Sequence, residues 1–249
     1  MKRLAALLLP LLLASLAAGA ATLRVAPGQD LQAAVDRAAA GDVIEVERGH
    51  YDVNLRIVRP LTLRGIGRPT LSGGQRGNTI DVLAADVTIE GLIVRDSGTS
   101  LVDQHAGVYV RPGAHRTTVR DNELTYNLFG LWIEKADDVV VQRNVITGLR
   151  DVQSSQRGNG VQLYNTQRAR IIGNNISFVR DAIYVDVSHR AIFRGNKMHH
   201  SRYGTHYMNS YHNLWEDNDT YYNRGGLALM EVRDRKSTRL NSSHANVSR

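Results

Sequence analysis

The fold is decided by a short stretch of the chain, Val141-Gln142-Arg143-Asn144-Val145-Ile146, in which a single Asn stands between two apolar runs. The same frame, apolar-x-x-Asn-x-apolar, recurs several times along the sequence. The repeated residues are Asn122, Asn144, Asn174, Asn196 and Asn218, at spacings of 22, 30, 22 and 22 residues. The longer interval contains an eight-residue insertion around 151–158, so the underlying period is 22. A period of this length is typical of proteins built from stacked repeats.

Each repeat holds two short runs of alternating apolar residues separated by turns, which predicts strands and no intervening helix. A coil of this size cannot bury its own apolar face, so successive coils must stack. We therefore expect an all-β fold, a right-handed parallel β-helix of the pectin-lyase type, with equivalent residues about 4.8 Å apart along the axis. The repeated Asn is interpreted as structural, because Asn tolerates left-handed backbone and its amide can hydrogen-bond to the Asn of the adjacent coils.

A short capping helix is expected before the coils. Apolar residues recur at helical spacing from Gln29 to Ala40, and Gly41-Asp42 ends the pattern before a strand begins at Val43. The helix would cover the open end of the stack, where the core and an unpaired strand edge would otherwise meet water.

Both ends of the chain are expected to lie outside the fold. Residues 1–20 combine a basic start, an apolar run and Ala18-Gly19-Ala20, which is the pattern of a cleaved signal peptide, and the apolar run is too short to span a membrane. At the other end, 234–249 lacks periodicity, and its first eleven residues, DRKSTRLNSSH, match a translated sequencing adapter. We therefore expect one repeat domain over 21–233, truncated at its C-terminus, in an exported and periplasmic protein.

The composition excludes several classes of function. The 249 residues are 42% hydrophobic and 22% charged, as in globular proteins. Of the formal charge of +7, Lys2 and Arg3 supply +2 and the last sixteen residues supply +3, so the body carries only +2. This argues against a nucleic-acid partner, which requires a basic patch in the folded body. The absence of Cys excludes disulfides, thiolate metal sites and Cys nucleophiles.

Strand parity separates core residues from candidate functional residues, because successive side chains point to opposite faces of a sheet. The strand after the small residue of each coil (Gly130, Gly160, Ala182, Gly204 and Gly226) can be sorted in this way. Its predicted inward positions are Leu131, Ile133, Val161, Leu163, Ile183, Val185, Thr205, Tyr207, Leu227 and Leu229. The outward positions form two ladders, and the second ends with methionines on two successive coils.

His206, Met208 and Met230 are the candidate metal ligands. His206 and Met208 share one face of one strand, roughly 7 Å apart, and Met230 should stack about 5 Å from Met208 on the next coil. An imidazole with two thioethers and no carboxylate suits soft Cu(I), whereas magnesium and calcium require oxygen ligands and zinc usually takes more His or Cys. The other His residues in this region and Met198 are interpreted individually as surface or core residues.

Three segments of the sequence resemble the NosD family of periplasmic copper-binding proteins. They are QRGNGVQLYNTQRARIIGNNISFVRDAIYVDVSH (156–189), RYGTHYMNSYHN (202–213) and GGLALM (225–230), of which RYGTHYM is the most specific. The resemblance implies a β-helix and a non-catalytic role in assembling the copper-sulfide centre of nitrous oxide reductase. It further implies work with a membrane ABC transporter, NosF and NosY, and with the copper-chaperone lipoprotein NosL.

Two other functions remain open from the sequence. Many exported β-helices are lyases, epimerases or hydrolases of acidic glycans, whose catalysis needs a base or paired carboxylates on one outward patch. Asp186 near Tyr164 and Tyr184 is one candidate group, and Asp96, Asp103 and His105 form another, but they are scattered over several coils. A passive scaffold is the third hypothesis, and it predicts neither metal binding nor turnover.

Overall fold

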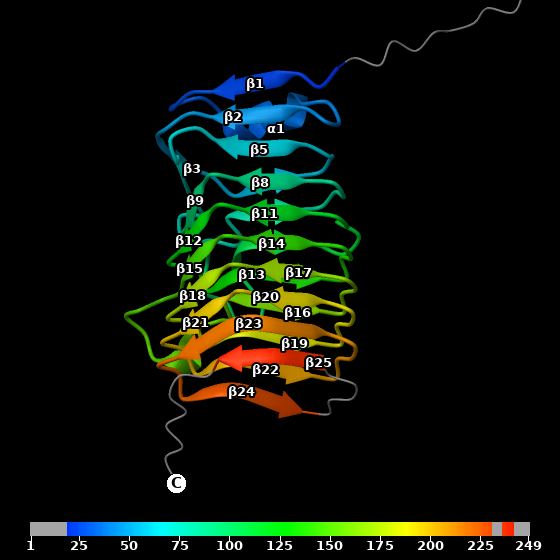
Figure 1. Cartoon of the computed structure of the whole chain (residues 1–249). Helices are drawn as coiled ribbons and strands as arrows, with labels where there is room; N and C mark the ends of the chain where they lie inside the picture. The colour runs from blue at the N-terminus through cyan, green and yellow to red at the C-terminus, as the bar shows by residue number, and fades with distance from the viewer. Residues whose placement is uncertain (1–18, 231–235, 242–249) are drawn as a thin grey trace, which may run out of the picture.

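The computed structural model describes residues 19–230 and the backbone of a strand at 236–241. These residues form a stack of coils around one core, which is the expected parallel β-helix (Figure 1). The body of the predicted signal peptide, residues 1–18, lies outside the described residues, as do 231–235 and 242–249. The strand at 236–241, which belongs to the adapter-like tail, pairs in parallel with residues 214–219, so this part of the tail lies within the stack and not outside the fold as expected. Within the described part, no helix is long and apolar enough to cross a membrane.

The strands align in three ladders, in which neighbouring strands run parallel. The first ladder contains β1 (Thr22–Val25), β2 (Val43–Val46), β5 (Thr62–Gly65), β8 (Thr88–Glu90), β11 (Thr118–Arg120), β14 (Val140–Gln142), β17 (Arg170–Ile172), β20 (Ile192–Arg194), β23 (Leu214–Tyr221) and β25 (Lys236–Asn241). The second contains β3 (His50–Asp52), β6 (Thr70–Ser72), β9 (Ile93–Arg95), β12 (Glu123–Thr125), β15 (Val145–Thr147), β18 (Asn175–Ser177), β21 (Lys197–His199) and the C-terminal part of β23. The third contains β4 (Leu55–Ile57), β7 (Ile80–Val82), β10 (Ala106–Val110), β13 (Phe129–Glu134), β16 (Val161–Tyr164), β19 (Asp181–Asp186), β22 (Tyr203–Met208) and β24 (Gly225–Met230).

The core consists of apolar columns that run along the axis of the stack. Ile171 pairs in register with Val141 on one side and with Phe193 on the other, and all three side chains are fully buried. Phe193 in turn stacks on Trp215 with ring centroids 4.0 Å apart. Because each coil buries its apolar face only against its neighbours, the 22-residue period and the core have the same physical origin.

The repeated Asn residues form a continuous hydrogen-bonded ladder inside the stack. Asn144 donates from Nδ2 to Asn174 Oδ1 over 3.0 Å, and Asn174 donates in the same way to Asn196. Each side chain is almost fully buried, so the predicted structural role is confirmed. The left-handed backbone, however, belongs to the preceding residue, for example Arg143 with φ of 53° and Gly173 with φ of 64°. The part of the interpretation that gave Asn this conformation is therefore wrong.

A small residue follows each turn because the next coil passes very close. A Cβ atom added to Gly160 would lie 2.6 Å from the carbonyl oxygen of Ala182, which no side chain can accommodate without displacement. The close approach of backbones therefore explains the glycine that the repeat pattern identified at this position.

The predicted capping helix is present but shorter than expected, as α1 (Leu31–Arg37). Asp30 caps its N-terminus by accepting a hydrogen bond from Ala33 N. Beyond Arg37 the backbone turns extended, and the Asp42 carboxylate accepts the backbone N–H groups of Ala39 and Ala21. This carboxylate offers the segment after Arg37 an alternative to helical hydrogen bonds, which ends the helix before Ala40.

Two loops project beside the third ladder. One, residues 96–105, joins β9 to β10, and the other, residues 148–160, joins β15 to β16 and contains the short 3-10 helix η1 (Ser154–Gln156). The second loop contains the eight-residue insertion that the repeat spacing predicted, and the strands on either side stay in register with their neighbours.

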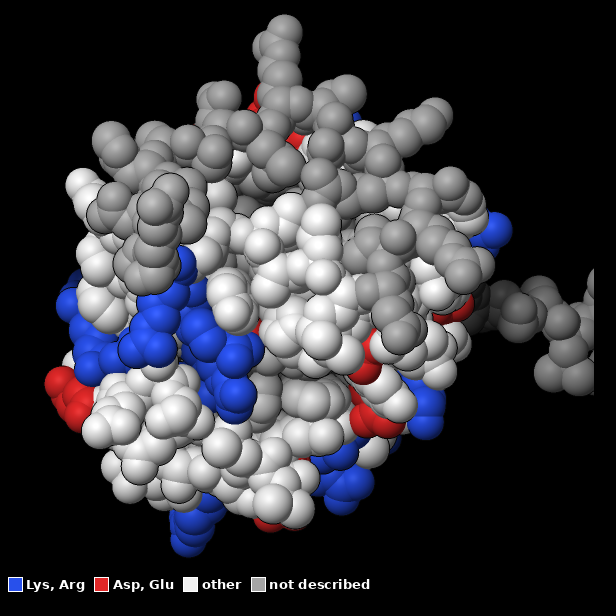
Figure 2. Space-filling model, turned by 90° about the horizontal axis from the view of Figure 1, so that it is seen from below, with Lys and Arg blue, Asp and Glu red and all other residues white. Residues whose placement is uncertain are grey.

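The last described coil departs from the predicted core. Leu227 is only half-buried, and Leu229 is 46% exposed, because β24 is the terminal strand of its ladder among the described residues. Figure 2 looks onto this end of the stack and shows uncharged residues across its middle, with Lys and Arg gathered along one side.

Candidate metal site and adjoining groove

The strand parity predicted for the candidate ligands is the one observed. Met208 of β22 pairs directly with Met230 of β24, and His206, two residues earlier on β22, pairs with Ala228. Inward neighbours such as Thr205 and Tyr207 are buried, so His206, Met208 and Met230 stand on the opposite, outward face. Joint binding of one copper ion by the three groups stays a prediction.

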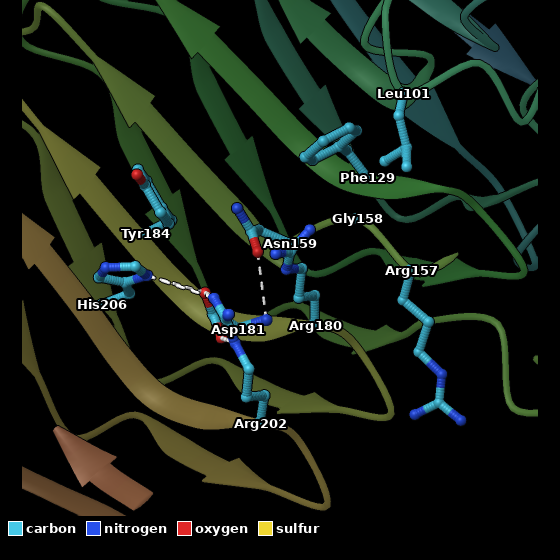
Figure 3. Close-up of a pocket in the computed structure, with 10 residues that line it drawn as sticks. All are labelled: Leu101, Phe129, Arg157, Gly158, Asn159, Arg180, Asp181, Tyr184, Arg202 and His206. Carbon is cyan, nitrogen blue, oxygen red and sulfur yellow. Dashed lines mark hydrogen bonds and ion pairs between the residues drawn. The ribbon is translucent and has the colours of Figure 1, made fainter. Parts of the chain in front are cut away.

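His206 is held in place by a buried carboxylate. Its Nδ1 lies 3.1 Å from Oδ2 of Asp181, and its side chain is 14% exposed (Figure 3). The ring also meets Tyr184 edge-on, with centroids 4.6 Å apart. A carboxylate on one imidazole nitrogen fixes the tautomer and leaves the other, here Nε2, as the nitrogen for a ligand. Parity predicted the face of His206 but not this anchoring by Asp181 from the preceding coil.

Arg202 neutralises the same carboxylate. Its Nε and Nη2 lie 2.9 and 2.5 Å from the two oxygens of Asp181, which is fully buried. Hydrogen bonding to Asp181 raises the pKa of Arg202 above its ordinary value. The backbone N–H of Asp181 donates to Asn159 Oδ1, so this residue is fixed from three sides (Figure 3).

The two thioethers differ in their surroundings. Met208 is half-buried, and its sulfur accepts a hydrogen bond from the Tyr184 hydroxyl over 2.8 Å. Burial and the nearby carboxylates of Asp186 and Asp181 raise the pKa of Tyr184, which keeps its hydroxyl protonated as a donor. Met230 is 52% exposed at the end of the ladder. A ligand set with one anchored imidazole, one engaged sulfur and one exposed sulfur suits weak, exchangeable metal binding.

No set of three or more His, Asp or Glu side chains gathers into a metal-binding group within the described residues. The predicted ligand set relies instead on the two thioethers, whose softness matches Cu(I) and does not match magnesium or calcium.

A groove that parity analysis missed runs along the outward face of the third ladder. It consists of two adjoining pockets of about 260 and 440 Å³ that share Phe129, Asn159 and Tyr184. The smaller pocket contains Asp181, Arg202 and His206, together with residues of both projecting loops, and is drawn in Figure 3. The larger pocket is lined by Gln104, Phe129, Trp132, Glu134, Asn159, Gln162, Tyr164, Tyr184 and Asp186. The sequence feature that could have predicted this groove is the pair of insertions between regular coils, because an inserted loop projects beside the sheet and forms one side of a groove.

One carboxylate that lines the larger pocket, Glu134, is held by a buried tyrosine. The Tyr109 hydroxyl donates to Glu134 Oε2 over 2.6 Å, and burial raises the pKa of this tyrosine. Trp132 packs edge-on against Phe129 with centroids 4.9 Å apart. Asp96, Asp103 and His105 do not line either pocket, so the second group of candidates for glycan catalysis is separate from the groove.

The fold and the outward face of the third ladder define the class of this protein. It is a parallel β-helix that presents one imidazole and two thioethers beside a groove lined by aromatic residues. Residues 143–248 match the family model described as periplasmic copper-binding protein (NosD). The chain is a NosD-family protein.

Two curated relatives agree with the family model. The chain is 35% identical over 170 residues to the probable ABC transporter binding protein NosD of Pseudomonas aeruginosa, covering 68% of this chain and 39% of the relative. It is 33% identical over 133 residues to the protein of the same name from Stutzerimonas stutzeri, covering 53% and 30%. The chain thus spans about two fifths or less of the length of either relative.

The solved structures that resemble the chain include glycan-active enzymes. Polygalacturonase from Erwinia carotovora superposes with a TM-score of 0.69 at 12% identity, over 91% of this chain and 81% of the enzyme. At this identity the likeness shows the β-helix fold alone.

Proposed function

We propose that this chain is a non-catalytic periplasmic protein that carries Cu(I) for assembly of the copper-sulfide centre of nitrous oxide reductase. In this role it works with the ABC transporter NosF and NosY and receives copper from the lipoprotein NosL. The observation that carries the proposal is the direct pairing of Met208 with Met230, with His206 on the same outward face. The family description and the names of the relatives support copper and an ABC transporter as partners.

The geometry supports transfer of the metal better than storage. Asp181 fixes the orientation of the His206 ring, so one ligand is preorganised. Met230 is exposed, so a partner can displace the thioethers from outside. A site with few ligands at the surface exchanges its metal with a docked protein more readily than a closed four-ligand site.

The test measures Cu(I) affinity by competition with a chromophoric chelator and, separately, the copper content of nitrous oxide reductase matured in cells. The double variant His206→Ala with Met208→Ala should weaken binding at least tenfold and lower the copper content of the reductase. Met198→Leu is the matched control, because Met198 is 2% exposed and lies in the core. Unchanged affinity and unchanged maturation in the double variant would refute the assignment.

The groove favours a second candidate, an enzyme that acts on acidic glycans. Sugar rings stack on aromatic side chains such as Phe129 and Trp132, and Glu134 and Asp186 supply carboxylates in the same pocket. Release of unsaturated or reducing ends from pectate or alginate, abolished by Glu134→Gln, would establish this function. Intact polysaccharide after prolonged incubation with the wild-type protein would exclude it.

A further inference from the structure

Two adjacent histidines meet at a corner of the coil. His199 is the last residue of β21, and His200 follows it with φ of 54°. Neighbouring side chains of a strand normally point to opposite faces, but a left-handed residue reverses this alternation. As a result, Nδ1 of His199 lies only 2.7 Å from Nδ1 of His200.

The tautomer of His199 is fixed by a third residue. Its Nε2 lies 2.9 Å from Oδ1 of Asn175 on the preceding coil, and an amide oxygen accepts only, so Nε2 carries the proton. Nδ1 of His199 is therefore unprotonated and accepts a hydrogen bond from Nδ1–H of His200.

Aromatic side chains stack on both rings. His199 stacks on Tyr221 with centroids 4.8 Å apart and planes at 13°, and His200 stacks on Phe178 at 4.9 Å and 20°. Phe178, His200 and Tyr222 share the same left-handed backbone on three successive coils, so this stack follows from the repeat. The His199 ring, held by Asn175 and Tyr221, therefore loses little further freedom when it binds a ligand, whereas the exposed His200 ring can still turn.

We propose that His199 and His200 form a second metal site, in which one cuprous ion takes the place of the proton between the two Nδ1 atoms. That proton leaves Nδ1 of His200 while Nε2 of the same ring takes one up, so the ring stays neutral. The exposed His200 side chain turns so that the ion lies between the two nitrogens. Imidazole nitrogen is a good ligand for copper, and the structure places two such donors side by side. Zinc usually takes three or four protein ligands and calcium takes six to eight oxygens, whereas this pair of imidazoles supplies two nitrogens. The hydrogen bond from His199 to Asn175 is the outer contact expected of a metal-binding imidazole. The site is distinct from His206, Met208 and Met230.

The test counts Cu(I) ions bound per chain by competition with a chromophoric chelator, using the full chain. His200→Asn is the informative variant, because Asn tolerates a positive φ and the fold should persist. His212→Asn is the matched control, since His212 is exposed and has φ of 59°. We expect two ions per chain for the wild type and for His212→Asn, and one for His200→Asn.

The outcome separates the two copper sites. The double variant Met208→Ala with Met230→Ala should lose one ion and keep the second. Loss of the second ion when His200→Asn is added supports this site. The second site is wrong if the wild type binds one ion, if that ion is lost in the methionine variant, and if His200→Asn has no effect on it. The proposed function would still stand in that case. Histidine nitrogen NMR of the wild type gives a check without mutation: the Nδ1 resonances of His199 and His200 must shift on addition of Cu(I), and unchanged resonances would also overturn the proposal.

Discussion

The carboxylate of Asp181 and the guanidinium of Arg202 form a bidentate ion pair in which the acid has no solvent exposure. The two residues lie on successive coils, 21 positions apart, so the pair ties β19 to the segment that enters β22. A buried charge without its partner is far more costly than an exposed one, because the protein interior cannot solvate it.

Removal of this partner should therefore destabilise the protein strongly. Arg202→Ala is expected to cost about 3–5 kcal/mol of unfolding free energy, measured by chemical denaturation. Arg194→Ala is the matched control, because Arg194 pairs with Glu216 at the surface and exposed pairs contribute about 0–1 kcal/mol. If the two variants lose the same unfolding free energy, the burial of Asp181 does not make its ion pair with Arg202 more important for stability than a surface pair.

The Asn ladder gives a second prediction. Asn144 accepts from Asn122 and donates to Val119 O and Asn174, all inside the core. Asn144→Ala leaves several of these groups without a hydrogen-bond partner, and each unsatisfied buried group lowers the unfolding free energy by about 1–3 kcal/mol. The variant should lose at least about 2 kcal/mol of unfolding free energy. Val145→Ala, at the adjacent residue that is 45% exposed, should lose much less, and a similar loss would contradict the role of the ladder.

His189 predicts a dependence of stability on pH. Its Nδ1 accepts the backbone N–H of Tyr211 over 3.0 Å, and burial, with the charges of Arg190 and His212, lowers its pKa below the ordinary 6.5. Between the lowered value and 6.5 the unfolded chain binds more protons, so the unfolding free energy rises with pH.

The stabilisation is thus complete above about pH 6.5 and is lost as the pH falls through the lowered pKa of the folded protein. Denaturation curves of the wild type from about pH 7 to pH 5 should show this decline. The variant His189→Gln should show a shallower decline, and parallel pH profiles would contradict the prediction.

Tyr184 controls the availability of the Met208 sulfur under the proposed copper function. The Tyr184→Phe variant removes the hydroxyl that donates to this sulfur and leaves the ring in place. A hydrogen bond contributes about 0.5–1.5 kcal/mol net, so Cu(I) affinity should increase about two- to tenfold in the chelator competition. Weaker binding in the variant would indicate that the hydroxyl supports the site instead of competing for the sulfur.

Periodicity predicted the fold and the outward face because both depend on local rules. The spacing of Asn122, Asn144 and Asn174 determines the coil length, and the two-residue alternation of a strand determines that Met208 and Met230 face outward. The anchoring of His206 by Asp181 could not be predicted in this way, since alternation defines a face but not the rotamer of a side chain.

Strand parity missed the groove and the paired histidines for other reasons. The groove exists because residues 96–105 and 148–160 rise beside the sheet, and the course of an irregular loop is not encoded in the repeat. His199 and His200 converge through one left-handed residue, whereas uninterrupted strand alternation would separate them.

The insertion at 151–158 also bears on how such proteins diversify. Strands β15 and β18 pair in perfect register on either side of it, so the extra residues are absorbed entirely at the rim. Each coil depends only on its immediate neighbours. Evolution can therefore lengthen, shorten or replace this loop and so change the binding surface of the protein, without disturbing the packing of the core.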